Sequence, residues 1–157
     1  MRECVLVVHN IRSAHNVGSM FRTADGAGVS RIILSGYSPG PLDPRGKGRA
    51  AFLKVSLGAE EMVPYSHEPL LADAIQKLKA DGYTIAAVEL SPNAQNIFDY
   101  KPKPDEKLAL VLGNEVDGIS PDDLALCDVV LEIPMRGTKE SLNVSVACGI
   151  ALFTLLR

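Results

Sequence analysis

The chain contains few cysteines. Only Cys4, Cys127 and Cys148 are present among its 157 residues, an odd number, and no C-x-x-C pair occurs. A disulfide framework or a zinc site therefore does not fit this sequence, and no metal site is expected. We expect these residues to be buried thiols in a reducing cytoplasm.

Signals for secretion and for membrane insertion are also missing. Residues 1–10 have too short an apolar core for a signal peptide. The most apolar segment, residues 144–156, falls well short of the ~20 residues that a membrane-spanning helix needs. Internal repeats, low-complexity tracts and linkers that could divide domains are absent too. We therefore expect a soluble, cytoplasmic protein that forms a single domain over residues 1–157, with no membrane contact.

Three common nucleotide-binding or catalytic signatures are missing as well. No G-x-G-x-x-G follows an apolar run, and no G-x-S-x-G nucleophile elbow occurs. The segment GPLDPRGKG, residues 40–48, looks a little like a phosphate-binding loop. However, Pro41 stands where the first glycine belongs, and Gly48 replaces the serine or threonine. The sequence therefore disfavours a P-loop NTPase.

Net charge is small but unevenly distributed. The formal charge of -3 argues against a protein that grips nucleic acid by bulk charge. Residues 1–54, however, hold eight Lys or Arg and three acids, whereas residues 55–157 hold eight basic and sixteen acidic residues. This asymmetry indicates an anionic partner on the N-terminal side.

Short apolar runs alternate along the chain with segments of helical periodicity. The strand candidates are Cys4–Val8, Arg31–Leu34, Thr84–Val88, Leu108–Leu112 and Val129–Ile133. The helix candidates are Asn16–Ala27, Ala50–Leu57, Leu70–Asp81, Pro121–Ala125 and Ser141–Leu156. Because the strands are rich in Val, Ile and Leu without alternation, they predict a parallel sheet flanked by helices on both faces. The fold class is α/β.

The segment HNVGSMFRTADGAGV, residues 15–29, predicts a helix just after the first strand. Asn16 is a suitable N-cap, and apolar residues recur behind it at helical spacing. Arg22 lies off this apolar stripe, and its side chain leans over Gly18, one turn earlier. A glycine in a helix interior costs about 1 kcal/mol, so Gly18 needs a reason. Either a ligand reaches Arg22 over it, or the helix packs tightly there.

A second segment, LALVLGNEVDGIS, residues 108–120, contains an apolar strand that ends abruptly in Gly113-Asn114-Glu115. In open parallel sheets, ligands bind at the carboxyl ends of strands. Gly113 would let a ligand approach the backbone, and Asn114 and Glu115 could face it. The alternative is an ordinary strand-to-helix turn in which Gly113 supplies the dihedral angles.

A third segment, residues 129–153, contains another apolar strand that ends near Ile133 and a helix predicted to open at Ser141. Ser141 is a good N-cap candidate. Asn143 has no obvious structural role in a helix this apolar. Because the helix is hydrophobic nearly all round, it is expected to be buried on several sides, by the core or by another subunit.

Together the three segments resemble the motifs of the SpoU/TrmH family of RNA 2'-O-ribose methyltransferases, in the SPOUT superfamily. Residues 16–29 are similar to the first family motif, residues 110–120 to the second and residues 133–152 to the third. The motifs occur in the family's order, and their joint occurrence is far more specific than any one alone. The candidate catalytic residues that match are Asn16, Arg22, Glu115, Ser141 and Asn143.

The resemblance implies the SPOUT fold, whose C-terminal segment is threaded into a deep trefoil knot, a rare exception among proteins. It also implies a homodimer that binds S-adenosylmethionine in the knot, here with no separate RNA-binding domain. The candidate cofactor-binding residues lie at strand ends and near the last helix: Glu89, Leu90, Leu112, Gly113, Asn114, Ile133, Met135 and Leu142.

The implied reaction is methyl transfer to the 2'-hydroxyl of a ribose in tRNA or rRNA. In the family, the first-motif arginine is proposed to act at this hydroxyl, as a base or through the neighbouring phosphate. Arginine resists deprotonation, so alignment of the phosphate is the easier role for Arg22. Gly18 would then leave room for the nucleotide. Candidate phosphate contacts are Arg12, Arg45, Lys47 and Arg49.

Two other functions remain open. One is a catalytically silent RNA- or nucleotide-binding module on the same fold, and the other is a flavodoxin-like protein that binds a small molecule without RNA. Transfer of a labelled methyl group from S-adenosylmethionine to bulk RNA distinguishes the enzyme from both.

Overall fold

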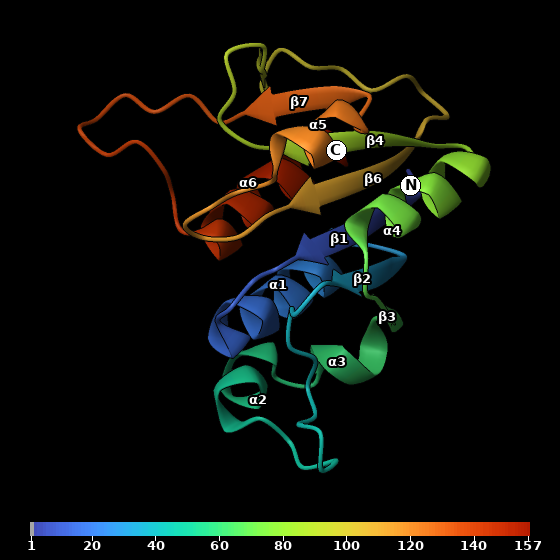
Figure 1. Cartoon of the computed structure of the whole chain (residues 1–157), viewed down its shortest axis with the longest axis vertical. Helices are drawn as coiled ribbons and strands as arrows, with labels where there is room; N and C mark the ends of the chain where they lie inside the picture. The colour runs from blue at the N-terminus through green and yellow to red at the C-terminus, as the bar shows by residue number, and fades with distance from the viewer. Residues whose placement is uncertain (1) are drawn as a thin grey trace.

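A seven-stranded parallel sheet forms the centre of the computed structural model, which describes residues 2–157 (Figure 1). Its strand order is β3-β2-β1-β6-β4-β7-β5, so β6 is inserted between β1 and β4. The strands are β1 (Cys4–His9), β2 (Arg31–Ser35), β3 (Tyr65–Glu68), β4 (Tyr83–Val88), β5 (Gln95–Asn96), β6 (Lys107–Leu112) and β7 (Val129–Glu132). The predicted α/β class and parallel sheet are confirmed.

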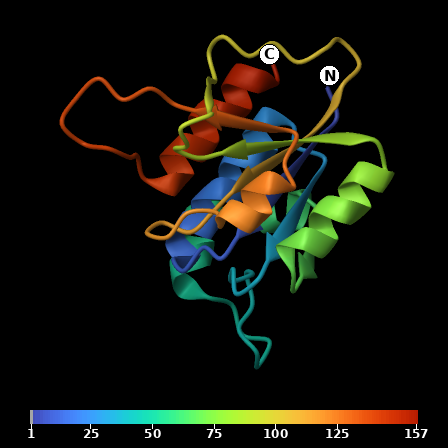
Figure 2. The same ribbon diagram turned by 45° about the horizontal axis from the view of Figure 1, so that its top comes forward.

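Helices cover both faces of the sheet, as Figures 1 and 2 show. They are α1 (Ala14–Ala27), α2 (Ala50–Ser56), α3 (Ala59–Met62), α4 (Leu71–Ala80), α5 (Pro121–Ala125) and α6 (Val144–Leu155). One hydrophobic cluster joins α1, α2, α3 and α6 to the sheet, and a second joins α4 and α5 to its other face.

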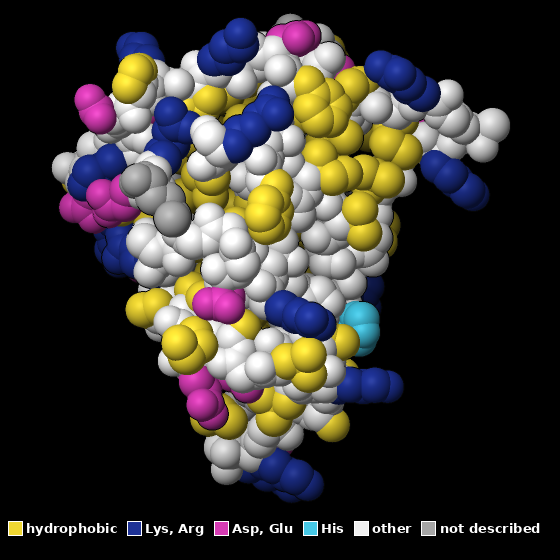
Figure 3. Space-filling view, turned by 180° about the vertical axis from the view of Figure 1, so that it is seen from behind, with side chains coloured by type: hydrophobic (Ala, Val, Ile, Leu, Met, Phe, Trp, Pro, Cys, Tyr) yellow, Lys and Arg dark blue, Asp and Glu magenta, His cyan; other side chains and the backbone are white. Residues whose placement is uncertain are grey.

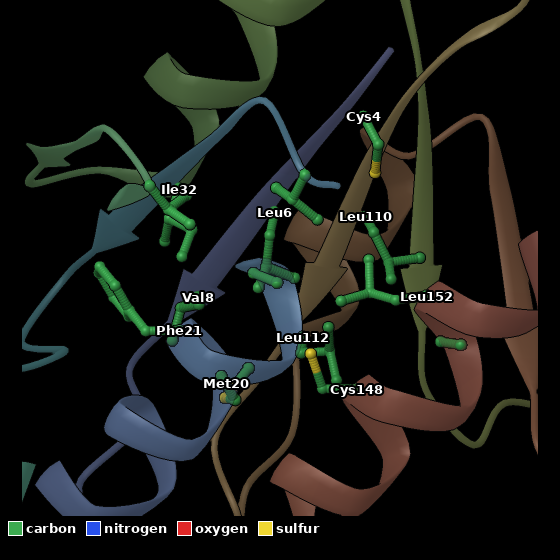
Figure 4. Close-up of a cluster of buried hydrophobic side chains, with 14 of the residues drawn as sticks. Cys4, Leu6, Val8, Met20, Phe21, Ile32, Leu110, Leu112, Cys148 and Leu152 are labelled. Atoms are coloured by element: carbon green, nitrogen blue, oxygen red, sulfur yellow. The ribbon is translucent and has the colours of Figure 1, made fainter. Parts of the chain in front are cut away.

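Alternate residues of the central strands feed these two clusters. Leu6 and Val8 of β1 face α1 and α6, whereas Val5 and Val7 face α4. Figure 4 shows the first cluster, in which side chains from α1 and α6 meet those of β1 and β6. Burial on both faces explains why the strands are continuously apolar rather than alternating.

The starts of two predicted helices are wrong. α1 begins at Ala14, because Ser13 is its N-cap and its hydroxyl accepts from the backbone N–H of Asn16. α6 begins at Val144, where the side chain of Asn143 accepts from the backbone N–H of Ser145. Asn143 therefore has a structural role as N-cap, and Ser141 lies in the segment before the helix.

The interpretation that Gly18 leaves room for a nucleotide is also wrong. Gly18 is buried, and a Cβ at this position would lie 2.5 Å from the carbonyl oxygen of Phe52 and 2.9 Å from Cγ2 of Val55. Both partners belong to α2. Close packing of α1 against α2 thus requires the glycine.

Three short elements were not predicted: α3, β3 and β5. The sequence of β3 is YSHE, which has no apolar run because the strand lies at the edge of the sheet and is largely exposed. β5 has only two residues. Neither offers the periodicity on which sequence reasoning depends.

The cysteines are free thiols, with Cys4 and Cys148 buried and Cys127 half-buried. Burial raises the pKa of Cys4 to about 12 and that of Cys127 to about 11, so both stay protonated at neutral pH. Across residues 2–157, no helix combines the length and apolar character needed to cross a membrane.

Candidate functional site

A cavity of about 300 Å³ opens at the carboxyl ends of β4, β6 and β7. Its walls combine strand ends with the segment before α6 and the first residues of that helix. This is the edge of the sheet at which ligands of open α/β proteins bind. All of the residues that the sequence offered for the cofactor line it: Glu89, Leu90, Leu112, Gly113, Asn114, Ile133, Met135 and Leu142.

Glu89 holds one wall of the cavity together. Its Oε1 accepts from the backbone N–H of Leu90 at 2.9 Å, and its Oε2 accepts from that of Ile119 at 3.0 Å. The carboxylate thereby ties the loop after β6 to the end of β4. Gly118, with φ of +65°, makes this approach possible, since a Cβ there would lie 2.4 Å from Glu89 Oε2.

Gly113 allows a close approach of the chain to itself. A Cβ on Gly113 would lie 2.5 Å from Cγ1 of Ile119 and 2.8 Å from the carbonyl carbon of Gly118. The missing Cβ of Gly113 therefore has a packing role, and contact of its backbone, which lines the cavity, with a ligand stays a prediction. The glycine lets the following loop fold back over the strand end and form the cavity wall.

Asn114 fixes the turn that follows. Its Oδ1 accepts from the backbone N–H groups of Val116 and Asp117, both at 2.8 Å. Its Nδ2 donates to the carbonyl oxygen of Asn10 at 2.9 Å. Asn114 is 7% exposed, and these bonds satisfy its buried amide.

Glu115 connects the cavity wall to the beginning of α1. Its carboxylate accepts from the backbone N–H of Arg12 at 3.2 Å and of Ser13 at 3.3 Å. Burial of the carboxylate by itself raises the pKa of Glu115. The hydrogen bonds from Arg12 and Ser13, from the backbone N–H of Glu115 itself and from the Asn16 side chain outweigh burial and lower the pKa overall. Glu115 is therefore ionised at neutral pH, beside the N-terminus of a helix, where a negative charge is favourable.

Asn16 joins the three motif segments. Its Nδ2 donates to Glu115 Oε1 at 3.3 Å, and its Oδ1 accepts from Asn143 Nδ2 at 3.3 Å. Since Ser13 supplies the N-cap of α1, the side chain of Asn16 is free for this purpose. The structure thus brings Asn16, Glu115 and Asn143 into one hydrogen-bonded chain beside the cavity.

The other two candidate catalytic residues lie apart from this chain. Ser141 is exposed and lines the cavity. Arg22 is exposed on α1 and is not among the cavity-lining residues. It follows Asn16 by six positions, which places it about 9 Å farther along the helix axis.

The four candidate phosphate-binding residues fall into two places. Arg12 is exposed at the start of α1, next to Glu115. Arg45 and Lys47 are exposed in a tight turn, where both backbone N–H groups donate to Asp43 Oδ1 at 2.8 and 2.9 Å. Arg49 is half-buried at the N-cap of α2, so its side chain is less accessible than the others.

Several cavity-lining residues escaped sequence reasoning: Val116, Glu132, Glu140, Val144 and Ala147. All but Glu132 lie inside the segments that match the family motifs, and Glu132 directly precedes one, so this placement is the signal that could have found them. Between residues 2 and 157, no three His, Cys, Asp or Glu side chains gather so that they could hold a metal ion.

Relatives of the chain are RNA-modifying enzymes. The model of the SpoU rRNA Methylase family matches residues 3–153. The 23S rRNA (guanosine-2'-O-)-methyltransferase RlmB of Vibrio cholerae is 36% identical over 153 residues, which cover 98% of this chain and 58% of that protein. RlmB of Neisseria meningitidis is 36% identical over 94% of this chain and 56% of its own length. The chain therefore spans a little over half the length of these relatives.

Solved structures share the fold. An AdoMet-bound rRNA methyltransferase from Sinorhizobium meliloti superposes with a TM-score of 0.86 at 27% identity, over 97% of this chain and 55% of that one. A TrmH/SpoU tRNA-modifying enzyme from A. aeolicus gives 0.83 at 27% identity, over 98% and 74%. The family model matches nearly the whole length of the chain, so the chain belongs to the SpoU rRNA methylase family.

Proposed function

We propose that the protein transfers a methyl group from S-adenosylmethionine to the 2'-hydroxyl of a ribose in RNA. The observation that carries this proposal is the junction of the three motifs, where the Asn143–Asn16–Glu115 chain adjoins the cavity. Relatives at 36% identity are named as guanosine-2'-O-methyltransferases of 23S rRNA. Their names favour an rRNA substrate, while the A. aeolicus structure keeps tRNA open.

The cavity suits S-adenosylmethionine in its chemistry. Leu112, Ile133 and Leu142 offer apolar surface for an adenine ring, and the strand-end backbone offers donors and acceptors for its edge. Carboxylates of Glu89, Glu115 and others line the same space and favour a positively charged sulfonium. When bound, S-adenosylmethionine supplies the methyl group. The residues of the chain orient it and exclude water.

On the acceptor side, Asn16, Asn143 and Ser141 would orient the ribose, and Glu115 would hold Asn16. Arg22 would align the phosphate beside the reacting hydroxyl, because a guanidinium binds phosphate in a fork and keeps its proton. Alignment of the reacting groups can supply about 7–11 kcal/mol of the barrier reduction. Arg12, Arg45, Lys47 and Arg49 would contact neighbouring phosphates.

A homodimer completes the proposal. α6 is apolar nearly all round, yet its Val146 and Phe153 are 50% and 58% exposed. Figure 3 shows hydrophobic side chains gathered on the side where α6 lies. α1 packs against α6. An interface across both helices would therefore bring α1 of a second copy, with its Arg22, near α6 of the first. Light scattering at micromolar concentration tests it, and a mass near that of one chain would contradict it.

The C-terminal trefoil knot and a cytoplasmic location belong to the same proposal. The insertion of β6 between β1 and β4 and the return of α6 onto α1 are compatible with a threaded C-terminal segment. A crystal structure with a continuous chain trace tests the knot, and cell fractionation tests the location.

Two measurements test the activity itself. Calorimetry of the purified protein should show S-adenosylmethionine binding without RNA, since the cavity is formed by the chain alone. Labelled S-adenosylmethionine should then deliver its methyl group to bulk RNA. Binding of both ligands without transfer would favour the silent binding module, and binding of neither would refute the proposal.

A further inference from the structure

Tyr37 presents an aromatic ring at the edge of the cavity region. It lies two residues after β2 and is 58% exposed. Its hydroxyl accepts from Nδ2 of Asn114 at 2.9 Å, and Asn114 lines the cavity. The polar tip of the ring thus points at the cavity wall while much of the ring faces solvent. A half-exposed ring held at its tip is a surface on which another flat group can lie.

The backbone around Tyr37 is held as firmly as its hydroxyl. Its N–H donates to Oδ1 of Asn10 at 3.2 Å. Asn10 itself adopts a left-handed conformation, with φ of +51°, and its N–H donates to the carbonyl oxygen of Ser35 at 3.1 Å. Gly36 makes room for this arrangement, because a Cβ there would lie 1.9 Å from Asn10 Oδ1. The ring is therefore oriented before any ligand arrives, which lowers the entropic cost of binding.

The surroundings of Tyr37 indicate what kind of ligand it meets. Glu115, directly after Asn114, connects to Asn16 and the proposed ribose site. Farther along the loop that contains Tyr37, Arg45 and Lys47 are exposed cations. An exposed aromatic ring beside a ribose site, with basic side chains farther along the same loop, suits the way in which proteins hold unpaired RNA bases.

We propose that the Tyr37 ring stacks on an unpaired base next to the reacting ribose and so positions the RNA strand. This inference rests on the proposed RNA methylation. Stacking on an aromatic side chain needs only the flat face of a base, so Tyr37 would contribute affinity and placement rather than base identity. A purely structural role, in which Tyr37 only supports Asn114 through its hydroxyl, makes different predictions.

Two substitutions separate these roles. Tyr37→Ala removes the ring and should weaken RNA binding by roughly five- to a hundred-fold, the range found for single stacked bases. Tyr37→Phe keeps the ring and loses only the bond to Asn114, so RNA affinity should stay within about two-fold of wild type. S-adenosylmethionine affinity, measured by calorimetry, should be unchanged in both variants.

A fluorescent reporter tests stacking directly. The chain contains no tryptophan, so Tyr37→Trp introduces a single indole at this position. A short single-stranded oligouridylate should quench its emission, and an abasic ribose-phosphate oligomer with the same number of phosphates should not. Leu126→Trp is the matched control. Leu126 is 40% exposed at the end of α5, near the opposite edge of the sheet, and should not respond.

The outcomes are distinct. Equal RNA affinity of Tyr37→Ala and wild type, or equal quenching by the abasic oligomer, would overturn the stacking proposal while leaving the proposed function intact. Equal losses in Tyr37→Ala and Tyr37→Phe, accompanied by weaker S-adenosylmethionine binding, would show that Tyr37 only supports Asn114. If the wild-type protein neither binds nor methylates RNA, the proposed function and the stacking proposal both fail.

Discussion

The cavity wall and the outer surface of α1 carry candidate site residues of two different kinds. In the wall, Glu89 ties two strand ends together, Asn114 closes a turn and Gly113 lets the loop fold back. Each has a folding role that alone explains its residue type. On α1, Arg22 is exposed and off the buried stripe, so packing gives no reason for its charge. The contrast indicates that substitutions in the wall disturb both folding and ligand binding. Substitution of Arg22 should lower the rate of methyl transfer without changing stability or cofactor affinity.

The largest effect is expected for Arg22→Ala. Loss of the group that aligns the phosphate beside the reacting hydroxyl should lower the single-turnover rate of methyl transfer by about 10²-fold or more. S-adenosylmethionine affinity should be kept, and the free energy of unfolding should change by no more than about 0.5 kcal/mol. Arg22→Lys should restore only part of the rate, because a point charge does not reproduce the guanidinium fork.

Arg45→Ala is the matched control for Arg22, since it also removes an exposed arginine. It should weaken RNA binding modestly and flatten its salt dependence without a collapse of the single-turnover rate. A near wild-type rate for Arg22→Ala at saturating RNA would make Arg22 an ordinary surface residue and remove the contrast between the two regions.

The next largest effect concerns Gly18, which sequence reasoning linked to Arg22. If α1 and α2 need the glycine for packing, Gly18→Ala should lower the free energy of unfolding by about 1–3 kcal/mol in urea titrations. Gly26→Ala is the control in the same helix. Its Cβ would meet only the Phe153 ring edge, at 3.9 Å, so this change should stabilise by up to about 1 kcal/mol. Unchanged stability of Gly18→Ala would mean that α2 can shift to accept the Cβ, and that close packing does not require the glycine.

The error at Gly18 shows which parts of the molecule the sequence could predict. The central strands could be predicted because each is a continuous apolar run. The three motif segments, found in order, predicted which strand ends line the cavity. The packing partner of α1 depends on residues distant in the sequence. No residue near Gly18 indicates that Phe52 of α2 lies against it. The same limit applies to Asn143, whose cap and bond to Asn16 depend on where α6 begins and on a partner 127 residues away.

Asn143 allows its structural and functional roles to be separated. Asn143→Ala removes the N-cap of α6 and should cost about 1 kcal/mol of unfolding free energy. Asn143→Ser keeps a capping oxygen but loses the amide that donates to Asn16, so stability should return while methyl transfer stays impaired. Full recovery of both stability and rate in Asn143→Ser would show that the link to Asn16 has no part in the reaction.

The smallest effect is expected for the pH dependence that Glu115 confers. Its pKa is lowered in the folded protein, so the charged carboxylate stabilises the fold above its ordinary pKa of 4.5, and this contribution is lost as pH falls through the lowered value. The difference in unfolding free energy between wild type and Glu115→Gln should therefore be constant from neutral pH to about pH 5 and shrink in stronger acid. Because Glu115 is largely exposed, this difference should stay below about 1 kcal/mol. If this difference in unfolding free energy grew on acidification, the hydrogen bonds from Arg12, Ser13 and Asn16 would not outweigh burial of the charge. Glu115 would then not be the residue that holds α1 to the cavity wall.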